Sequence, residues 1–198
     1  MDLTEAELAR WDAWTPSDLA RRFTGVSARW YVIAGWALDL FLGRVTREHE
    51  DLEIGIAADD FGAIRDALAE FELLVVSQGR ALPPTEHALA AHRQTWVREP
   101  ATGAWRLDVI RERWDRDTWA YERDPRITRT AAELVARTAE GIPYMQPEVV
   151  LLFKAHATRP KDEDDFAAVL PQLDESRRGW LVEALEIVQP GHAWIDAL

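Results

Sequence analysis

Residues 34–56, AGWALDLFLGRVTREHEDLEIGI, decide the fold of this chain. The stretch ends in Asp51-Leu52-Glu53, two carboxylates two positions apart among apolar residues. On a β-strand, residues at that spacing point to the same side, and two converging carboxylates suit Mg²⁺. The small pair Ala34-Gly35 follows an apolar run at residues 30–33. The pattern indicates phosphate chemistry, and the alternative is a pair of solvated carboxylates at a strand end.

The segments around this stretch predict a mixture of strands and helices. Short apolar runs predict strands, and apolar residues at helical spacing predict helices. Gly43 is placed to end the first buried helix. A five-residue loop that contains glycine predicts a hairpin. We expect strands at 30–33, 50–56 and 73–76, helices at 36–42 and 61–71, a hairpin from 94–98 and 105–110, and irregular chain at 77–92 and 111–130.

The last third of the chain reads as helical. Pro147 opens an apolar segment, Pro171 ends the next one, and Asp174 is a typical N-cap for a third. These helices are expected at residues 148–158, 161–170 and 174–188. The fold class is therefore α+β, with an α+β core at residues 1–145 and a C-terminal helical segment at residues 146–198 packed on it.

Composition excludes several classes of function. The chain has 198 residues, 47% of them hydrophobic, no cysteine and a net charge of −12. The lack of cysteine excludes disulfides, zinc–thiolate sites and thiol nucleophiles. The charge argues against a nucleic-acid partner and fits a small cationic substrate better. The first residues do not resemble a signal peptide, and no apolar run reaches the roughly 18 residues of a membrane span, so we expect a cytoplasmic protein.

Several catalytic motifs are missing from the sequence. The chain contains no G-x-x-x-x-G-K-[ST], no G-x-G-x-x-G, no H-E-x-x-H and no G-x-S-x-G. Asp108, by contrast, sits between apolar residues on a predicted strand, where aspartate is depleted. It is either a solvent-facing edge residue or a third carboxylate that joins Asp51 and Glu53. Three carboxylates could hold one or two Mg²⁺ ions beside a triphosphate, and one of them could accept a proton.

The candidate phosphate-binding residues are basic. Lys154 lies inside an apolar helix, where it either snorkels to solvent or reaches a phosphate. Arg44 and Arg47 precede Asp51, in a solvated loop or in position to neutralise phosphate charge. Asp39 lies among apolar residues and is expected to pair with one of these two arginines. The acidic residues near 162–165 are expected to complement the dipole of a helix.

The pattern from Gly35 to Glu53 resembles a known family. It reads Gly-Trp-Ala-Leu-Asp-x-x-x-Gly-Arg-x-Thr-Arg-x-His-x-Asp-x-Glu. With the same spacing, it resembles the aminoglycoside and lincosamide nucleotidyltransferases of the polymerase-beta-like superfamily. A second segment, residues 141–166, resembles the C-terminal helices of those proteins. Between the two segments the likeness is loose.

The resemblance implies a small mixed sheet flanked by helices, with C-terminal helices. It implies Mg²⁺-dependent transfer of a nucleoside monophosphate, AMP from ATP or the equivalent from another NTP, to a hydroxyl of a small molecule such as an aminoglycoside. Asp51, Glu53 and Asp108 match the catalytic and metal-binding carboxylates. Gly35 matches the glycine next to the triphosphate, and Arg44, Arg47 and Lys154 are the further candidates for the nucleotide.

Two alternatives remain open. A toxin-like nucleotidyltransferase that modifies tRNA or a protein would need a basic patch, drawn from Arg44, Arg47, Arg93, Arg98, Arg106, Arg111 and Arg113. A catalytically impaired nucleotide-binding relative is the other alternative. It is motivated by Ala34 and Glu53, which stand where the family usually has a glycine and an aspartate.

Overall fold

The computed structural model describes residues 2–198, which divide into two compact units. The first unit contains the chain up to Val32 together with Glu48–Trp114, and the second contains Ile33–Arg47 with Asp115–Leu198. The division differs from the expected boundary after residue 145. The reason is that helix α3 (Ala34–Leu42) packs against the C-terminal helices α7 (Pro147–Ala155) and α8 (Pro160–Val169).

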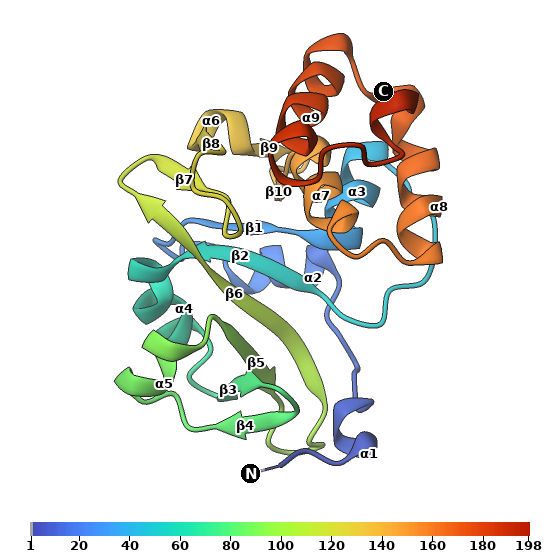
Figure 1. The fold of residues 1–198 in the computed structure, drawn as a ribbon. Helices are drawn as coiled ribbons and strands as arrows, with labels where there is room; N and C mark the ends of the chain where they lie inside the picture. The colour runs from blue at the N-terminus through green and yellow to red at the C-terminus, as the bar shows by residue number, and fades with distance from the viewer. Residues whose placement is uncertain (1) are drawn as a thin grey trace. The chain divides into compact units, whose positions relative to one another are not determined.

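The first unit is built on a mixed sheet with strand order β4-β3-β5-β6-β2-β1. Strands β2 and β6 are parallel, and the other neighbouring pairs in this order are antiparallel. Figure 1 shows β6 running alongside β2. The strands are β1 (Trp30–Val32), β2 (Glu53–Ala57), β3 (Glu72–Ser77), β4 (Arg80–Leu82), β5 (Gln94–Arg98) and β6 (Trp105–Asp115).

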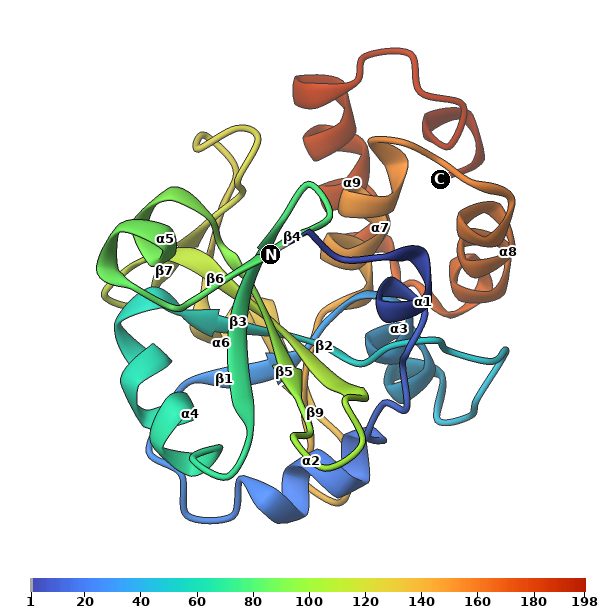
Figure 2. The same ribbon diagram turned by 90° about the horizontal axis from the view of Figure 1, so that it is seen from below.

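One face of this sheet carries the main hydrophobic core. Ile54 pairs with Val109 in the β2–β6 register, and both side chains are fully buried. Helices α2 (Pro16–Arg22) and α4 (Phe61–Ala67) lie on the same side of β1 (Figure 2). Because side chains alternate along a strand, the neighbouring residues of β2 and β6 point to the opposite face. The short helices α1 (Glu5–Leu8), η1 (Ala58–Asp60) and α5 (Glu86–Ala91) complete this unit.

The second unit is a group of helices with two small strand pairs. Helix α7 contacts α3, α8 and α9 (Glu175–Val188), and these helices lie close together in Figure 1. The strand pairs are β7 (Thr118–Ala120) with β8 (Thr128–Thr130) and β9 (Val135–Arg137) with β10 (Pro143–Met145), both antiparallel. The remaining elements are α6 (Ala131–Leu134), η2 (Leu170–Gln172) and η3 (Ile195–Ala197).

Two segments expected to be irregular are ordered, which corrects the sequence analysis. Residues 77–92 contain β4 and α5, and residues 111–130 contain the end of β6 and the β7–β8 pair. Two of the charged residues at the end of β6, Arg111 and Glu112, are buried in it. Arg111 donates to Thr95 Oγ1, and Glu112 accepts a hydrogen bond from the Tyr31 hydroxyl. Pairing with neighbouring strands therefore overrides local composition there.

Over the rest of the chain the expected elements are present. The strands before Gly35 and after Asp51, the hairpin and the three C-terminal helices all form near the expected bounds. In residues 2–198, no helix has the length and apolar character that a membrane crossing requires.

Candidate functional site

Glu53 and Asp108 lie side by side on the face of the sheet opposite the main core. They are register partners in the parallel pair β2–β6, and the Asp108 backbone N–H donates to Leu52 O at 2.8 Å. Adjacent strands are about 4.8 Å apart, and paired residues point to the same face. The fold therefore brings together two of the three predicted carboxylates from positions 55 residues apart in the sequence.

Asp51 lies in the segment just before β2, outside the strand. Its charge is close enough to contribute to raising the pKa of Asp108. Among residues 2–198, however, no group of three or more His, Cys, Asp or Glu side chains is arranged so that it could hold a metal ion. The three carboxylates thus influence one another electrostatically without forming a ready-made ligand cage.

Asp108 has an unusual environment for a carboxylate. The residue is 2% exposed, and its Oδ1 is buried with no hydrogen-bond partner within residues 2–198. The Gln94 side-chain amide donates to Oδ2. Burial, followed by the charge of Glu53, raises the pKa of Asp108 well above the usual value. A buried acceptor oxygen without a partner, beside two further carboxylates, fits the oxygen donors that Mg²⁺ prefers.

Trp96 and Gln94 flank this aspartate on β5. Trp96 is the register partner of Asp108, and its indole N–H favours the charged carboxylate although it makes no hydrogen bond of ordinary geometry. Sequence reasoning placed both residues on a strand but gave them no role. The sequence signal that could have indicated a role was the polar Gln94, two positions from Trp96 and therefore on the same face of the predicted strand.

Gly55 leaves room on the same face for the buried Tyr31. A Cβ at Gly55 would lie 2.5 Å from Tyr31 Cε2 and 2.9 Å from a carboxylate oxygen of Glu112. Tyr31 is fully buried and donates to Glu112, which is also buried. Burial raises the pKa of the Tyr31 hydroxyl well above its usual value. The glycine is therefore required by this close approach, and sequence reasoning had assigned no role to the pair.

The other predicted residues belong to the second unit. Gly35 is buried in the first turn of α3, whose N-cap Ile33 provides no side-chain hydrogen bond. Ala34, rather than Gly35, adopts the left-handed conformation, with φ of 55°. This conformation places Cβ close to the backbone and is costly for alanine. Arg44 lies just after α3 and is exposed.

Lys154 and Arg47 are held by aspartates of α8. Lys154 Nζ lies 2.7 Å from Asp162 and 2.9 Å from Asp165, and Arg47 makes two hydrogen bonds to Asp165 at 3.0 and 3.1 Å. Burial alone would raise the pKa of Asp162 and that of Asp165. Hydrogen bonds from Arg159 and Lys154 lower the pKa of Asp162, and those from Arg47 and Lys154 lower the pKa of Asp165. The acids near 162–165 thus neutralise buried cations, in addition to lying in the early turns of a helix.

The pairing predicted between Asp39 and either Arg44 or Arg47 is found in part. Its carboxylate accepts hydrogen bonds from the backbone and side chain of Thr46. Its charge also raises the pKa of Arg47. Asp39 therefore stabilises the loop after α3 and lies within electrostatic reach of one of the two expected arginines.

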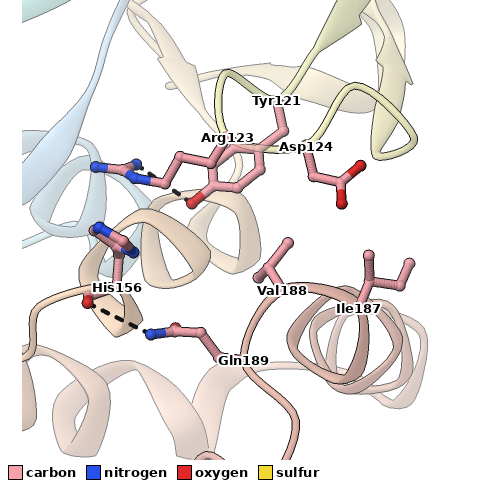
Figure 3. Close-up of a pocket in the computed structure, with 7 residues that line it drawn as sticks. All are labelled: Tyr121, Arg123, Asp124, His156, Ile187, Val188 and Gln189. Carbon is pink, nitrogen blue, oxygen red and sulfur yellow. Dashed lines mark hydrogen bonds between the residues drawn. The ribbon is translucent and has the colours of Figure 1, made fainter.

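The second unit also contains a pocket of about 390 Å³. Residues from the β7–β8 loop, the end of α7 and the end of α9 line it (Figure 3). Arg123 donates to the Tyr121 hydroxyl at 3.3 Å, and Gln189 donates to His156 O at 3.4 Å. None of the predicted site residues lines this pocket. The candidate catalytic carboxylates Glu53 and Asp108 lie instead on a face of the sheet in the first unit.

Solved structures of similar fold include a lincosamide antibiotic adenylyltransferase and the antibiotic-resistance factor ANT(2'')-Ia. The lincosamide antibiotic adenylyltransferase LnuA, solved with lincomycin bound, has a TM-score of 0.55 and 18% identity, over 86% of this chain and 98% of its own. ANT(2'')-Ia in complex with adenylyl-2''-tobramycin has a TM-score of 0.59 and 13% identity, over 86% and 95%. The solution structure of ANT(2'')-Ia has a TM-score of 0.58 and 14% identity, over 86% and 89%. These likenesses confirm the predicted α+β fold.

The sequence comparisons give a family match but no curated relative. No curated protein sequence matches the chain. The family model described as aminoglycoside-2''-adenylyltransferase matches residues 17–130, which include Asp51, Glu53 and Asp108. The match spans more than half of the chain and confirms the resemblance read from residues 35–53. The protein therefore belongs to the aminoglycoside-2''-adenylyltransferase family and is a nucleotidyltransferase.

Proposed function

We propose that this enzyme transfers AMP from ATP, with Mg²⁺, to a hydroxyl group of an aminoglycoside-like antibiotic. The family match supports nucleotidyl transfer with an NTP co-substrate. The single observation that carries the catalytic assignment is the Glu53–Asp108 pair, in which a buried carboxylate oxygen has no hydrogen-bond partner in the described chain.

In the proposed reaction the acceptor hydroxyl oxygen attacks the α-phosphorus of ATP. A new P–O bond forms, the bond to the β-phosphate oxygen breaks, and pyrophosphate leaves with its electron pair. The hydroxyl proton passes to a carboxylate, for which Asp108 is the candidate. Positioned proton acceptors of this kind contribute about 10²–10⁴-fold to rate.

Asp51, Glu53 and Asp108 are the residues that would hold Mg²⁺. The bound ion would supply positive charge to the triphosphate and would favour the ionised carboxylates. Without a cation, burial and the neighbouring charge of Glu53 raise the pKa of Asp108. The direction of this change supports Asp108 as a proton acceptor, because a carboxylate whose pKa is raised binds a proton more tightly than an ordinary aspartate does.

The phosphate-binding roles of Gly35, Arg44, Arg47 and Lys154 stay predictions. Arg44 is exposed and has charge to offer a phosphate. Lys154 and Arg47 are paired with buried aspartates, so binding a phosphate through either residue would compete with these ion pairs. Among the three basic residues, we expect Arg44 to be the most readily available cation.

The acceptor is proposed from charge and from the named relatives. A net charge of −12 favours a polycationic acceptor over an anionic one. One structural relative was solved with an adenylylated tobramycin, and another with lincomycin. An aminoglycoside carries several ammonium groups, which suit an acidic protein. Of the seven arginines considered for a nucleic-acid patch, Arg98 and Arg106 are paired with glutamates. This argues against the toxin-like alternative.

The test is transfer of label from α-³²P-ATP to a panel of aminoglycosides and lincosamides, with and without Mg²⁺. We expect a labelled product with at least one aminoglycoside and loss of transfer on chelation. Asp108→Asn should lower kcat by about 10²–10⁴-fold. Asp66→Asn, an exposed carboxylate on α4, is the matched control and should leave kcat unchanged.

The catalytically impaired alternative has its own support. Ala34 occupies a left-handed conformation, and the three carboxylates form no ready-made metal cage within residues 2–198. If wild type binds ATP but transfers no label to any acceptor, and Glu53→Asp with Ala34→Gly leaves transfer at zero, this alternative replaces the enzyme proposed above.

A further inference from the structure

Gln94 reaches Asp108 from the neighbouring strand. In the β5–β6 register Gln94 is paired with Ile110, so Asp108 is its diagonal neighbour on the same face. Diagonal neighbours lie within reach of long side chains. The Gln94 Nε2 group donates to Asp108 Oδ2. The amide therefore contacts the candidate catalytic carboxylate directly, from a rigid strand in the sheet.

This hydrogen bond makes the two carboxylate oxygens unequal. Oδ2 is held by Gln94, whereas Oδ1 is buried without a hydrogen-bond partner in the described chain. Rotation of an aspartate carboxylate about its last torsion is soft, so an unanchored group samples a broad range of orientations. A donor fixed in place on one oxygen restricts the orientation of the group and, with it, the direction of the other oxygen.

We propose that Gln94 is a positioning residue, which fixes the Asp108 carboxylate so that Oδ1 is the oxygen offered to Mg²⁺ or to the acceptor hydroxyl. The inference rests on the function proposed above. Partners that orient a metal-binding or catalytic group contribute about 10–100-fold to metal affinity or activity when they are removed.

The Gln94 amide that holds Asp108 is neutral, whereas the partners of the buried Asp162 and Asp165 are cations. Asp165 is held by Lys154 and Arg47, which neutralise its charge. An arginine in place of Gln94 would bind both oxygens of Asp108 and cancel the charge that a cation or proton must meet. Gln94 anchors one oxygen and leaves the charge and the second oxygen unused.

The test compares Gln94→Met, which keeps the length of the side chain and removes its donor, with wild type. Mn²⁺ binding to the enzyme alone is measured by calorimetry, and kcat and KM are measured with ATP and the acceptor. We expect Mn²⁺ to bind about 10-fold more weakly and kcat to fall about 10–100-fold. The KM for the acceptor should stay within about twofold, a split that a general loss of structure would not produce.

Two controls separate positioning from folding. Arg98→Met changes another long polar residue of β5, which pairs with Glu72, and should leave Mn²⁺ binding and kcat unchanged. If Gln94→Met does not fold, Gln94→Leu is measured in its place, since it also removes the donor and adds no charge. The same losses are expected from it.

A double-mutant cycle with Asp108→Asn decides the assignment. If Gln94 acts through Asp108, adding Gln94→Met to Asp108→Asn should cause little further loss of Mn²⁺ binding or of kcat. Wild-type values for Gln94→Met, with Asp108→Asn still strongly impaired, would overturn the positioning role and leave the proposed function intact. If Asp108→Asn itself keeps wild-type transfer, the proposed catalytic role of Asp108 is wrong and the inference falls with it.

Discussion

Asp108 in the first unit and Asp162 in the second are buried to nearly the same extent, with 2% and 1% of their surface exposed. Their pKa values nevertheless move in opposite directions. Burial and the charge of Glu53 raise the pKa of Asp108, whereas hydrogen bonds from Arg159 and Lys154 overcome burial and lower the pKa of Asp162. Burial therefore does not distinguish the two residues. The charge of their partners does.

The difference separates a stabilising cluster from a candidate reactive centre. In the second unit Asp162 and Asp165 both contact the buried Lys154, and each contacts one further cation, Arg159 or Arg47, so their charges are neutralised. In the first unit the neighbours of Asp108 are the carboxylates of Glu53 and Asp51, the Gln94 amide and the Trp96 indole, none of which is a cation. An uncompensated buried charge is costly, and it is typical of functional sites.

The largest effect on stability is expected from Lys154→Met. Removing the cation leaves the buried Asp162 and Asp165 each with one of its two cations, Arg159 or Arg47, and breaking a buried pair in this way costs about 3–5 kcal/mol. Urea unfolding at neutral pH measures the loss. Lys161→Met, an exposed lysine at the start of α8, is the matched control and should change the free energy of unfolding little. A loss below about 1 kcal/mol for Lys154→Met would show that the cluster is not stabilising.

Gly55→Ala should be the next largest change and tests the packing around the carboxylates. The new Cβ would approach the fully buried Tyr31 ring to 2.5 Å, and overpacking of this kind costs about 1–3 kcal/mol. Thermal and urea unfolding measure it. Gly62→Ala on α4, where a Cβ meets nothing within 4 Å, is the matched control and should be neutral or stabilising. Equal stabilities of the two variants would contradict the close approach.

Asp108→Asn should stabilise the metal-free protein at neutral pH, by about 1 kcal/mol, while it lowers kcat as stated above. Because the folded-state pKa of Asp108 is raised, the folded protein binds the proton more tightly than the unfolded chain does. The stability that Asp108 contributes is therefore present at pH below 3.8 and is lost as the pH rises through the folded-state pKa.

The stability difference between Asp108→Asn and wild type is measured by urea unfolding at several pH values between 8 and 5, in the presence of a chelator. The advantage of the variant should shrink as the pH falls. A constant advantage, or a loss of stability at neutral pH, would mean that the carboxylate is compensated by a group other than those described above.

The smallest effect is expected from Ala34→Gly. Alanine at φ of 55° is strained, and glycine relieves that strain while it adds entropy to the unfolded chain. The net gain should be about 0.5–1 kcal/mol in the free energy of unfolding. Ala37→Gly, inside α3 in ordinary helical conformation, is the control and should lose about 1 kcal/mol. Destabilisation by both variants would contradict the left-handed conformation of Ala34.

The sequence by itself determined the α+β class and the family, and it singled out three carboxylates whose role stays a prediction. Alternation on a strand is a local property, but β2 begins at Glu53, so the expected placement of Asp51 and Glu53 on one side of a strand does not extend to Asp51. Helical spacing in the C-terminal third is local as well, and its three helices form close to the expected bounds. Helical patterns of this kind are retained in the folded protein because the local preference agrees with the packing of the helices.

Only the tertiary structure decided which charges are compensated and how the chain divides into units. The pairing of Glu53 with Asp108, the donor from Gln94 and the contact of Tyr31 with Glu112 all join residues from different strands. The same holds for Lys154 and its aspartates on the following helix. Electrostatic energies depend on distances in space and on burial, and neither is encoded at any one position of the sequence.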